Sequence, residues 1–596
     1  MSEIAPSPTL SYASAPSRSF VRHAKLIGGL TLVSRITGLA REIVAGHYLG
    51  TGLVASAFTV AFTIPNLFRK LFGEGALSAA FIPLYSQALR REEIRTAGEP
   101  VDRLAVVHDT SGSPPVIDYA QDVGQSAADF ATASVNLLCI ILLALTIIGE
   151  AILLTLIAVE HNHDHLLTLK FTAIMLPYVL LICGTAFLGG ILQVHKRFGA
   201  PAAAPIILNV CHVAVVFIGA WLLHLHRGLS VQATLAKQTT LAYWLCFFVL
   251  VAGVMQAAVL LPSLRAIGFQ FRPVFHIWTP AIRKMLKLTV PVALGAGVLQ
   301  LSVLLDKGIS MVLMQDQDSA GHVITHFSLL GHVIRYPMEN GAPARLNLAQ
   351  FLYQFPLGVF AIALATAIFP NLSAVALDKD RSHFKAVLRQ GIEATLFEGL
   401  AASVGLILIR TPATRLLFQH GQISAHDADL IASSVLYYSA AIWAFSLQQI
   451  LNRAFYALHD TTTPLVMSML TLAVNLVVEV PLVWHLGEAG MAVGTLVSFA
   501  AQAIIMLYML DRRLGGMDLS KVRTPFIKML CATALMTAVC LGVMHSPIYP
   551  KGNHRSDWAM QLVMLMALGS LTYVGACAAM GLDTLTHILP KRLRRA

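Results

Sequence analysis

The sequence predicts an all-α polytopic membrane protein with about 14 transmembrane helices, forming two six-helix lobes around a central cavity plus two C-terminal helices. Composition gives the first reason: 56% of the 596 residues are hydrophobic, 12% are charged and mean hydropathy is +0.69, whereas soluble domains carry roughly 25% charged residues. The apolar runs are also long and uninterrupted, which favours helices over barrel strands of about 10 residues. Lastly, one motif recurs in the two halves of the chain.

Each predicted helix is an apolar run of about 20 residues or more, the length needed to cross a bilayer. Several runs are longer than this minimum, which predicts tilting or extension beyond the lipid. The predicted helices cover residues 25–48, 53–88, 128–158, 166–194, 202–225, 239–262, 284–314, 347–376, 386–409, 428–457, 463–485, 489–511, 524–545 and 557–587.

These helices divide the chain into two lobes. We expect an N-terminal lobe at 23–266, which includes a polar cytoplasmic loop at 90–127. The C-terminal lobe is expected at 281–515, with an insertion at 315–346 on the outward side. Helices 13 and 14 follow at 523–587.

The two ends of the chain are predicted to be cytoplasmic. Residues 1–22 are rich in Ser and Pro and lack the apolar core of a signal peptide, so we expect a disordered tail. Residues 588–596 form a basic tail. Lys and Arg concentrate in alternate loops on one side, which under the positive-inside rule places that side in the cytoplasm.

An internal repeat links the halves. The segment ALSAAFIPLYS at 76–86 matches ALATAIFPNLS at 363–373, with small, apolar and Pro positions in register. Both copies end helices on the predicted cytoplasmic side. The sequence therefore predicts a parallel duplication, as in transporters built from two like halves.

Six charged residues lie inside the first two predicted helices. A charge at the bilayer centre costs about 2.5 to 3.5 kcal/mol even on the lenient scale, so such residues normally face a bundle interior or a wet cavity. Cations outnumber carboxylates in this set, which predicts a cavity for an anionic substrate. The residues are Arg35, Arg41, Glu42, Arg69, Lys70 and Glu74.

Arginine is the residue type that best binds phosphate or carboxylate, because its guanidinium group donates forked, charge-assisted hydrogen bonds. Arg35 and Arg41 are about 240° apart on an ideal helix. They share a face only if Gly38 lets the helix bend or unwind, so we assign Gly38 a gating role. Pro65 is expected to break the second helix before Arg69 in the same way.

A structural alternative stays open for these charges. Arg41 with Glu42, and Lys70 with Glu74, would then be charge pairs that hold helices together, while the arginines extend to the membrane interface.

A second polar group lies further along. Asp306, in the seventh predicted helix, and Asn475, in the eleventh, are candidates for coupling to Na⁺ or H⁺. Lys307 is adjacent to Asp306, and simple neutralisation is the alternative. Arg453 and Asp460 flank the end of the tenth helix, where a helix-end or gating role is expected.

The remaining motifs argue against catalysis, a resident cofactor or a metal. His161, His163 and His165 fall in a short predicted loop, where solvation is favoured over metal binding. The chain has no P-loop or HExxH motif and no recognisable catalytic triad, so we predict that it is not an enzyme. The net charge of +11 lies at membrane edges, which predicts contact with membrane lipids and not with nucleic acid.

Four blocks then occur in order: SRITGLAREIVAGHYLG, AFTVAFTIPNLFRKLFGEGALSAAFIP, YQFPLGVFAIALATAIFP and FYALHDTTTP. They closely resemble the MurJ/MviN lipid II flippases of the MOP transporter superfamily, over nearly the whole chain. The resemblance implies a bacterial inner-membrane flippase that moves undecaprenyl-diphosphate-linked peptidoglycan precursor between leaflets by alternating access, beside the cell-wall synthesis machinery.

The resemblance also assigns residues. The family's cavity arginines map onto Arg35, Arg41 and Arg69, and its neighbouring cation and acid map onto Lys70 and Glu74. These are the positions already selected by charge.

The chain departs from the family pattern at several positions. Glu42 stands where the family usually has Asp, and Ser56 where Asp is frequent. Gln350 and Phe351 replace an Asp-Arg pair, so one cavity cation is missing, and Arg345 is the candidate substitute.

Other functions remain open on this sequence. One alternative is an exporter of another polyprenyl-linked glycan, or an ion-coupled drug antiporter. Cationic drugs would require more acids than arginines in the site, whereas the reverse holds here. The alternative of another class is a non-transporting scaffold or an enzyme of envelope synthesis.

Overall fold

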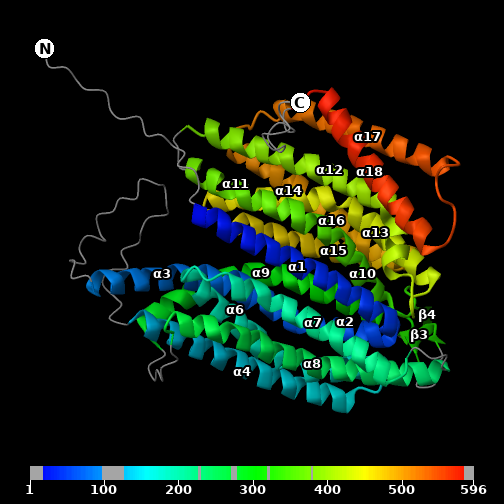
Figure 1. The fold of residues 1–596 in the computed structure, drawn as a ribbon, viewed down its shortest axis with the longest axis horizontal. Helices are drawn as coiled ribbons and strands as arrows, with labels where there is room; N and C mark the ends of the chain where they lie inside the picture. Colours follow the sequence, from blue (N-terminus) through cyan, green and yellow to red (C-terminus); the bar gives the residue numbers. More distant parts are fainter. Residues whose placement is uncertain are drawn as a thin grey trace.

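The structure is a computed structural model that describes residues 18–96, 126–225, 230–269, 278–317, 323–329, 331–376 and 380–582. Long helices run side by side along the length of the molecule (Figure 1). Helix α18 (Arg555–Ala579) ends along one side of the bundle, and α1 (Arg18–Leu49) begins at one end of it. A β-hairpin projects at the other, which we call the hairpin end.

The first half of the chain forms one group of helices. Within it α1 packs on α7, α7 and α6 pack on α8, and α2 packs on α5. The α5 and α6 helices are bent by 43° relative to each other at Pro177, which has no N–H for a helical hydrogen bond. The elements are α2 (Leu53–Phe68), the π-helix η1 (Arg69–Gly75), α3 (Ala76–Thr96), α4 (Ala127–Val159), α5 (His163–Met175), α6 (Tyr178–Val194), α7 (Gly199–Leu222) and α8 (Val231–Ala266).

The second half packs mainly on itself. Helix α12 contacts α13, α14, α17 and α18, and α15 pairs with α16, while α9 contacts both α2 and α15 and so links the halves. The helical elements are α9 (Pro280–Val312), α10 (Ala342–Pro356), the π-helix η3 (Leu357–Ala361), α11 (Ile362–Val375), α12 (Ser382–Phe418), α13 (Ala425–Ala440), α14 (Ile442–Ala457), α15 (Thr462–Leu486), α16 (Glu488–Arg513) and α17 (Ser520–His545).

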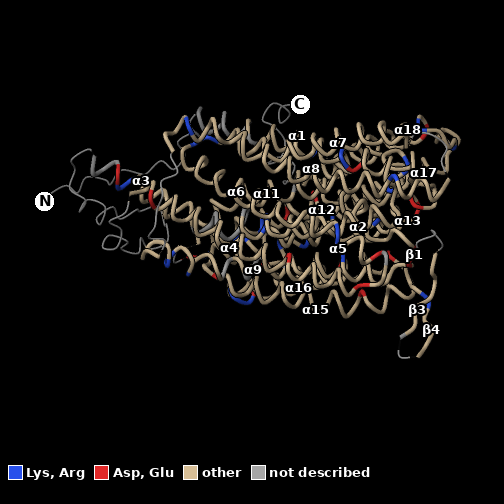
Figure 2. The backbone as a smooth tube through the Cα atoms, turned by 90° about the horizontal axis from the view of Figure 1, so that it is seen from below, with Lys and Arg blue, Asp and Glu red and all other residues tan. Residues whose placement is uncertain are grey.

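The outer surface of the bundle is apolar. Large side chains such as Leu154, Trp221 and Val477 are 61%, 66% and 73% exposed. Lys, Arg, Asp and Glu residues occur at both ends of the bundle and at some positions within it, while most of the backbone along its length carries other residues (Figure 2). An apolar surface this extensive is unfavourable in water and matches a lipid environment. The predicted polytopic, helical membrane fold is therefore confirmed.

The number of membrane crossings depends on how bent and charged helices are counted. Among the described residues nine helices are long and apolar enough to cross a membrane, or up to eleven if each bent pair counts as one span. The predicted helices outside this set are α1, the α2–α3 run and α9. These elements carry intramembrane charges or are interrupted, so their length or mean hydropathy falls below that of a typical membrane-spanning helix. Fourteen crossings stays a prediction.

Both halves contain a helix that is interrupted by a π-helix. The α2–η1–α3 run and the α10–η3–α11 run share this design, and the repeated motif of the sequence lies in α3 and α11. Pro65 lies four residues before η1 and Pro356 directly before η3. Proline removes one helical hydrogen bond, which favours such a local change of winding. Pro65 was expected to break the helix just before Arg69, and the α-helix indeed ends at Phe68, where the π-helical winding begins.

The predicted outward insertion contains two small antiparallel hairpins. Strand β1 (Asp316–Gln317) pairs with β2 (Val323–Ile324), and β3 (His326–Leu329) pairs with β4 (His332–Arg335). The His161–His165 segment is not simply a loop, because Asn162 caps α5 and the helix begins at His163. No group of three or more His, Cys, Asp or Glu residues suited to a metal ion occurs in the described part of the chain.

Candidate functional site

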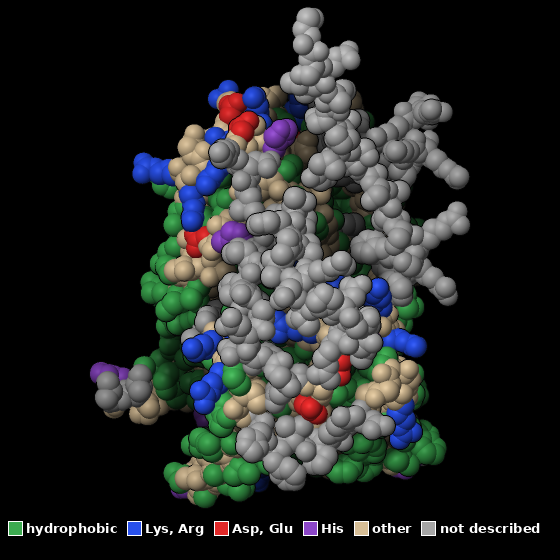
Figure 3. Space-filling model, turned by 90° about the vertical axis from the view of Figure 1, so that its left-hand side faces the viewer, with side chains coloured by type: hydrophobic (Ala, Val, Ile, Leu, Met, Phe, Trp, Pro, Cys, Tyr) green, Lys and Arg blue, Asp and Glu red, His purple; other side chains and the backbone are tan. Residues whose placement is uncertain are grey.

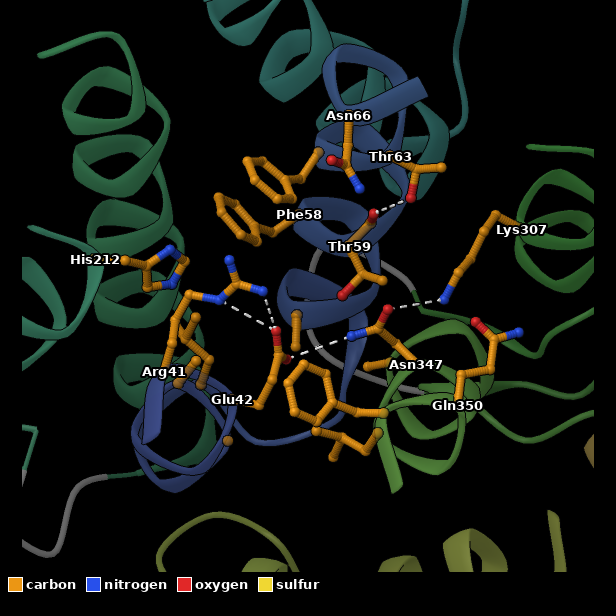
Figure 4. Close-up of a pocket in the computed structure, with 18 of the residues that line it drawn as sticks. Arg41, Glu42, Phe58, Thr59, Thr63, Asn66, His212, Lys307, Asn347 and Gln350 are labelled. Atoms are coloured by element: carbon orange, nitrogen blue, oxygen red, sulfur yellow. Dashed lines mark hydrogen bonds and ion pairs between the residues drawn. The ribbon is translucent and has the colours of Figure 1, made fainter. Parts of the chain in front are cut away.

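A cavity of about 220 Å³ lies between the two halves of the chain (Figure 4). Arg41 and Glu42 of α1, Lys70 of η1 and Lys307 of α9 line it. Three cations against one carboxylate give these side chains a formal charge of +2. Further lining residues come from α2, α7 and α10, and they include Phe58, Thr59, Phe62, Thr63, Asn66, His212, Asn347, Gln350, Phe351 and Gln354.

Arg41 is held by partners on two helices. Its Nη2 lies 2.6 Å from Oε1 of Glu42, and its Nη1 donates to Oδ1 of Asn209 at 3.2 Å. Asn209, in α7, in turn donates to the carbonyl oxygen of Ser34 at 3.1 Å. The guanidinium group also lies 5.7 Å from the ring centre of Phe62. These contacts fix the orientation of a cation beside the cavity.

A chain of hydrogen bonds then crosses the cavity wall from α1 to α9. Nδ2 of Asn347 donates to Oε2 of Glu42 at 3.3 Å, and Nζ of Lys307 donates to Oδ1 of Asn347 at 3.2 Å (Figure 4). Lys307 is 3% exposed. Its ammonium group is thus hydrogen-bonded in the cavity wall, while the adjacent Asp306 hydrogen-bonds to Asn475.

The other two predicted cavity arginines, Arg35 and Arg69, do not line the cavity themselves but hydrogen-bond to residues that do. Nη1 of Arg35 donates to the carbonyl oxygen of Gln354 at 3.4 Å, and Nε of Arg69 donates to Oδ1 of Asn66 at 2.9 Å. Both partners line the cavity. The guanidinium of Arg35 also lies against Gly358, where a Cβ would overlap it. The side chain of Glu74 lies outside the described residues.

The expected bend at Gly38 is absent, because α1 is helical without interruption from Arg18 to Leu49. A Cβ at Gly38 would lie 3.5 Å from Phe351 and 3.6 Å from Asn209. Both distances are ordinary van der Waals contacts, so the packing of α1 on its neighbours does not itself require glycine here. Without a bend, Arg35 and Arg41 point to different neighbours.

Arg345 does not replace the missing cavity cation. It is 2% exposed, and it forms ion pairs with Asp427 at 3.0 Å and Glu488 at 2.8 Å. Gln350 and Phe351, which replace the family's Asp-Arg pair, both line the cavity. The side-chain amide of Gln350 donates to the Tyr438 hydroxyl at 3.1 Å. Lys307 is the cation that the structure adds to the site.

Sequence reasoning missed most of the supporting residues. Asn209 and His212 lie in one apolar run, PIILNVCHVAVV, where two polar side chains three residues apart were a usable signal. Asn347 follows the outward insertion and gave no such signal. Lys307 was considered only as a neighbour of Asp306.

The two halves meet at the hairpin end through the end of α1. The carbonyl oxygen of His47 accepts from the backbone N–H of Gln422 at 2.9 Å, and its Nδ1 lies 2.8 Å from Nδ1 of His420. Oγ1 of Thr51 donates to Oδ1 of Asp427 at 2.8 Å. These residues belong to the α12–α13 connection and to α13, so their contacts close the space between the halves at this end.

The predicted ion-coupling residues form a separate buried group. Nδ2 of Asn475 donates to Asp306 at 3.0 Å and to Glu479 at 2.9 Å. Glu479 is fully buried, and its Oε1 has no hydrogen-bond partner in the described structure.

Arg453 and Asp460 occupy helix-end positions. Nη2 of Arg453 donates to Thr366 at 2.8 Å, linking α14 to α11. Asp460 accepts from the backbone N–H of Thr463 at 2.9 Å, which caps the start of α15, and it forms an ion pair with Arg513. The helix-end expectation agrees with these contacts.

The chain matches the family model described as lipid II flippase MurJ over residues 45–549. This match covers most of the 596 residues. The chain belongs to the MurJ family. It is 28% identical to the probable lipid II flippase MurJ of Rhizobium tropici, over 90% of this chain and 89% of that protein. The lipid II flippase MurJ of Burkholderia cenocepacia is also 28% identical, over 87% of this chain and 88% of that protein.

Solved structures show the same fold. A MurJ structure described as lipid II flippase MurJ, inward closed conformation, matches with a TM-score of 0.68 at 20% identity, covering 94% of this chain and all of the other. An inward-facing MATE multidrug transporter of the MOP superfamily matches with a TM-score of 0.55 at 14% identity, covering 83% of this chain and 98% of the other. The predicted MurJ and MOP resemblance is confirmed.

Proposed function

We propose that this MurJ-family protein moves lipid II, the undecaprenyl-diphosphate-linked peptidoglycan precursor, from the inner to the outer leaflet by alternating access. One observation supports this most strongly: a cavity between the two halves carries Arg41, Lys70 and Lys307 against Glu42. Cationic side chains at membrane depth are costly, and a cavity lined by several of them suits an anionic substrate.

In this mechanism Arg41 binds the diphosphate. Because Glu42 already occupies part of its guanidinium group at 2.6 Å, the substrate has to compete with that carboxylate. Lys307, held by Asn347 on the facing wall, supplies charge from the other side. The polyprenyl tail stays in lipid, and the contacts at the hairpin end break as that end opens. Transport needs no covalent step, so we assign no catalytic residue.

We also propose that the hairpin end faces outward and that both chain ends are cytoplasmic. Lys and Arg side chains surround the opposite face of the molecule (Figure 3), as the positive-inside rule expects of a cytoplasmic face. Lipid II would then enter from the face where it is made, and the protein would work beside the enzymes that make and use it.

A further proposal concerns energy coupling. Asp306 and Glu479 share the amide of Asn475 deep in the second half. In the described structure no Lys or Arg side chain forms an ion pair with either carboxylate, so Na⁺ or H⁺ is a suitable partner. We expect Asp306→Asn and Asn475→Ala to remove the Na⁺ or pH dependence of transport in proteoliposomes. Transport that keeps its ion dependence in both variants would refute this assignment.

The main experiment measures which leaflet holds lipid II after the protein is depleted from its host. We expect lipid II to accumulate in the inner leaflet, and wild-type protein but not Arg41→Ala to restore its outward movement. Arg415→Ala, which alters a half-exposed surface pair with Asp429, serves as the control. Unchanged leaflet accessibility after depletion would refute the proposed function.

A further inference from the structure

His212, in α7, lines the cavity without a hydrogen-bond partner. Among the described residues neither ring nitrogen has a donor or acceptor in reach, although the side chain is only 6% exposed. The ring contacts Phe58 edge-on, with centres 5.5 Å apart. Packing alone does not explain a histidine at this position, because both of its ring nitrogens are buried without a hydrogen bond to any described residue.

Leaving this ring unsatisfied carries an energetic cost. A neutral imidazole has one N–H donor and one acceptor nitrogen, and buried groups of this kind are nearly always paired. An apolar side chain of similar size would pack against Phe58 without that cost. The exception is therefore best explained by a partner that is present in only part of the working cycle.

The position of the ring indicates what that partner is. His212 lies one helical turn beyond Asn209, the residue that holds Arg41, and Arg41 is close enough to act on it electrostatically. Figure 4 shows His212 and Arg41 on the same side of the cavity. A second cation beside Arg41 would be repelled, so the suitable partner is an anion that Arg41 attracts.

We propose that His212 is a ligand of the diphosphate group of the lipid-linked substrate, donating a ring N–H to a phosphate oxygen held by Arg41. This inference rests on the proposed function and identifies a residue that determines which headgroups the cavity accepts. An imidazole beside a guanidinium provides two directed donors for adjacent phosphates. Arg41 alone does not distinguish a diphosphate from a single carboxylate.

Purified full-length protein and undecaprenyl diphosphate, presented in detergent micelles, provide the test. Equilibrium binding is measured for wild type, His212→Leu, His212→Gln and Arg41→Ala. The matched control is His485→Leu, an exposed histidine of α15 outside the cavity. We expect His212→Leu to weaken binding about tenfold, the effect of losing one hydrogen bond to a charged group. His212→Gln, which keeps an N–H donor, should recover most of the affinity.

Thermal unfolding separates a ligand from a structural residue. His212→Leu should unfold at the same or a higher temperature than wild type, because it removes an unsatisfied buried group. Wild-type affinity in His212→Leu together with weakened binding in Arg41→Ala would overturn the role of His212 alone. Should that variant not accumulate, His212→Phe replaces it under the same criteria. Wild-type protein that does not bind the lipid at all would overturn the proposed function as well.

Discussion

Arg41 combines a structural contact with a position in the proposed substrate site. Its ion pair with Glu42 was the structural alternative raised from the sequence, and that pair exists at 2.6 Å. Yet both residues also line the cavity, and Asn209 and Phe62 hold the guanidinium group in place. The pair therefore shields the cation while the site is empty and does not exclude a role in binding.

Replacing Arg41 by Lys should separate charge from geometry. Lysine keeps the charge but lacks the planar fork that reaches Glu42 and Asn209 together. We expect Arg41→Lys to lose more than 90% of lipid II transport at normal membrane levels, close to Arg41→Ala, in a leaflet-accessibility assay. Transport near the wild-type level in Arg41→Lys would mean that positive charge alone is enough.

Arg345 provides a prediction about stability. It is buried and bridges Asp427 of α13 and Glu488 of α16, so Arg345→Ala leaves two carboxylates without their cation. We expect a loss of about 3–5 kcal/mol in the free energy of unfolding. Arg415→Ala, at the exposed pair with Asp429, should cost about 1 kcal/mol or less. Equal losses measured by denaturant unfolding would show that burial does not control the effect.

Some residue roles were predictable and others were not. The cost of intramembrane charge correctly selected Arg41, Glu42 and Lys70 as cavity residues. Sequence cannot say where a charge points, so Lys307 was considered only as a neutralising neighbour of Asp306, and Arg345 as a candidate substitute for the missing cavity cation. Pairing with residues far along the chain, such as Asn347 and Glu488, decides both cases.

At the scale of elements, the α12–α13 connection is the contact that closes the hairpin end. Gly421 adopts φ of +64°, and a Cβ there would overlap the carbonyl oxygen of His47. We expect Gly421→Ala to destabilise closure by roughly 1–3 kcal/mol and to expose this end to thiol reagents at an introduced cysteine. Gly268→Ala is the matched control, because Gly268 has φ of +71° and open space around it. The same reactivity in both variants would refute the role of Gly421.

The same contact predicts a pH dependence. Burial, followed by the proximity of His47 and Arg555, lowers the pKa of His420, although a hydrogen bond to Leu417 opposes the shift. The closed state thus binds fewer protons than a state in which His420 is free, so closure is favoured above the ordinary histidine pKa of about 6.5 and weakens as pH falls through that range.

We expect acid to increase access from the hairpin end, measured by labelling an introduced cysteine at pH 5.5 and pH 8. Because the ring of His47 lies 2.8 Å from that of His420, replacing both by Asn should abolish the difference, whereas His485→Asn, a change at an exposed histidine, should keep it. A pH response that persists in the double variant would assign the effect to another group.

The π-helices are the elements that sequence reasoning did not anticipate. The matching segments at 76–86 and 363–373 correctly pointed to related positions, and both follow a π-helix in the structure. Pro65 and Pro356 gave a signal for a local break but not for its kind. The periods of an α-helix and a π-helix differ by only about one residue per turn, and a hydropathy pattern over one short segment cannot distinguish them.

At the scale of the whole molecule, composition and run length were enough to predict the helical membrane fold. They were not enough to count crossings, because α1, the α2–α3 run and α9 are the elements with charges or interruptions. Those same elements line the cavity, together with α7 and α10. The proposed substrate site therefore lies in the elements whose hydropathy signal is weakest.

The composition of α1 also has a consequence for how the chain is made. Arg35, Arg41 and Glu42 enter the insertion machinery first, yet Asn209, which supports Arg41, is synthesised more than 150 residues later. Transfer of a helix with these charges from the translocon into the bilayer, without its partner helices, is energetically unfavourable. We therefore expect α1 to stay beside the translocon until α7 emerges, so that nascent chains truncated before α7 are extracted and degraded during biogenesis.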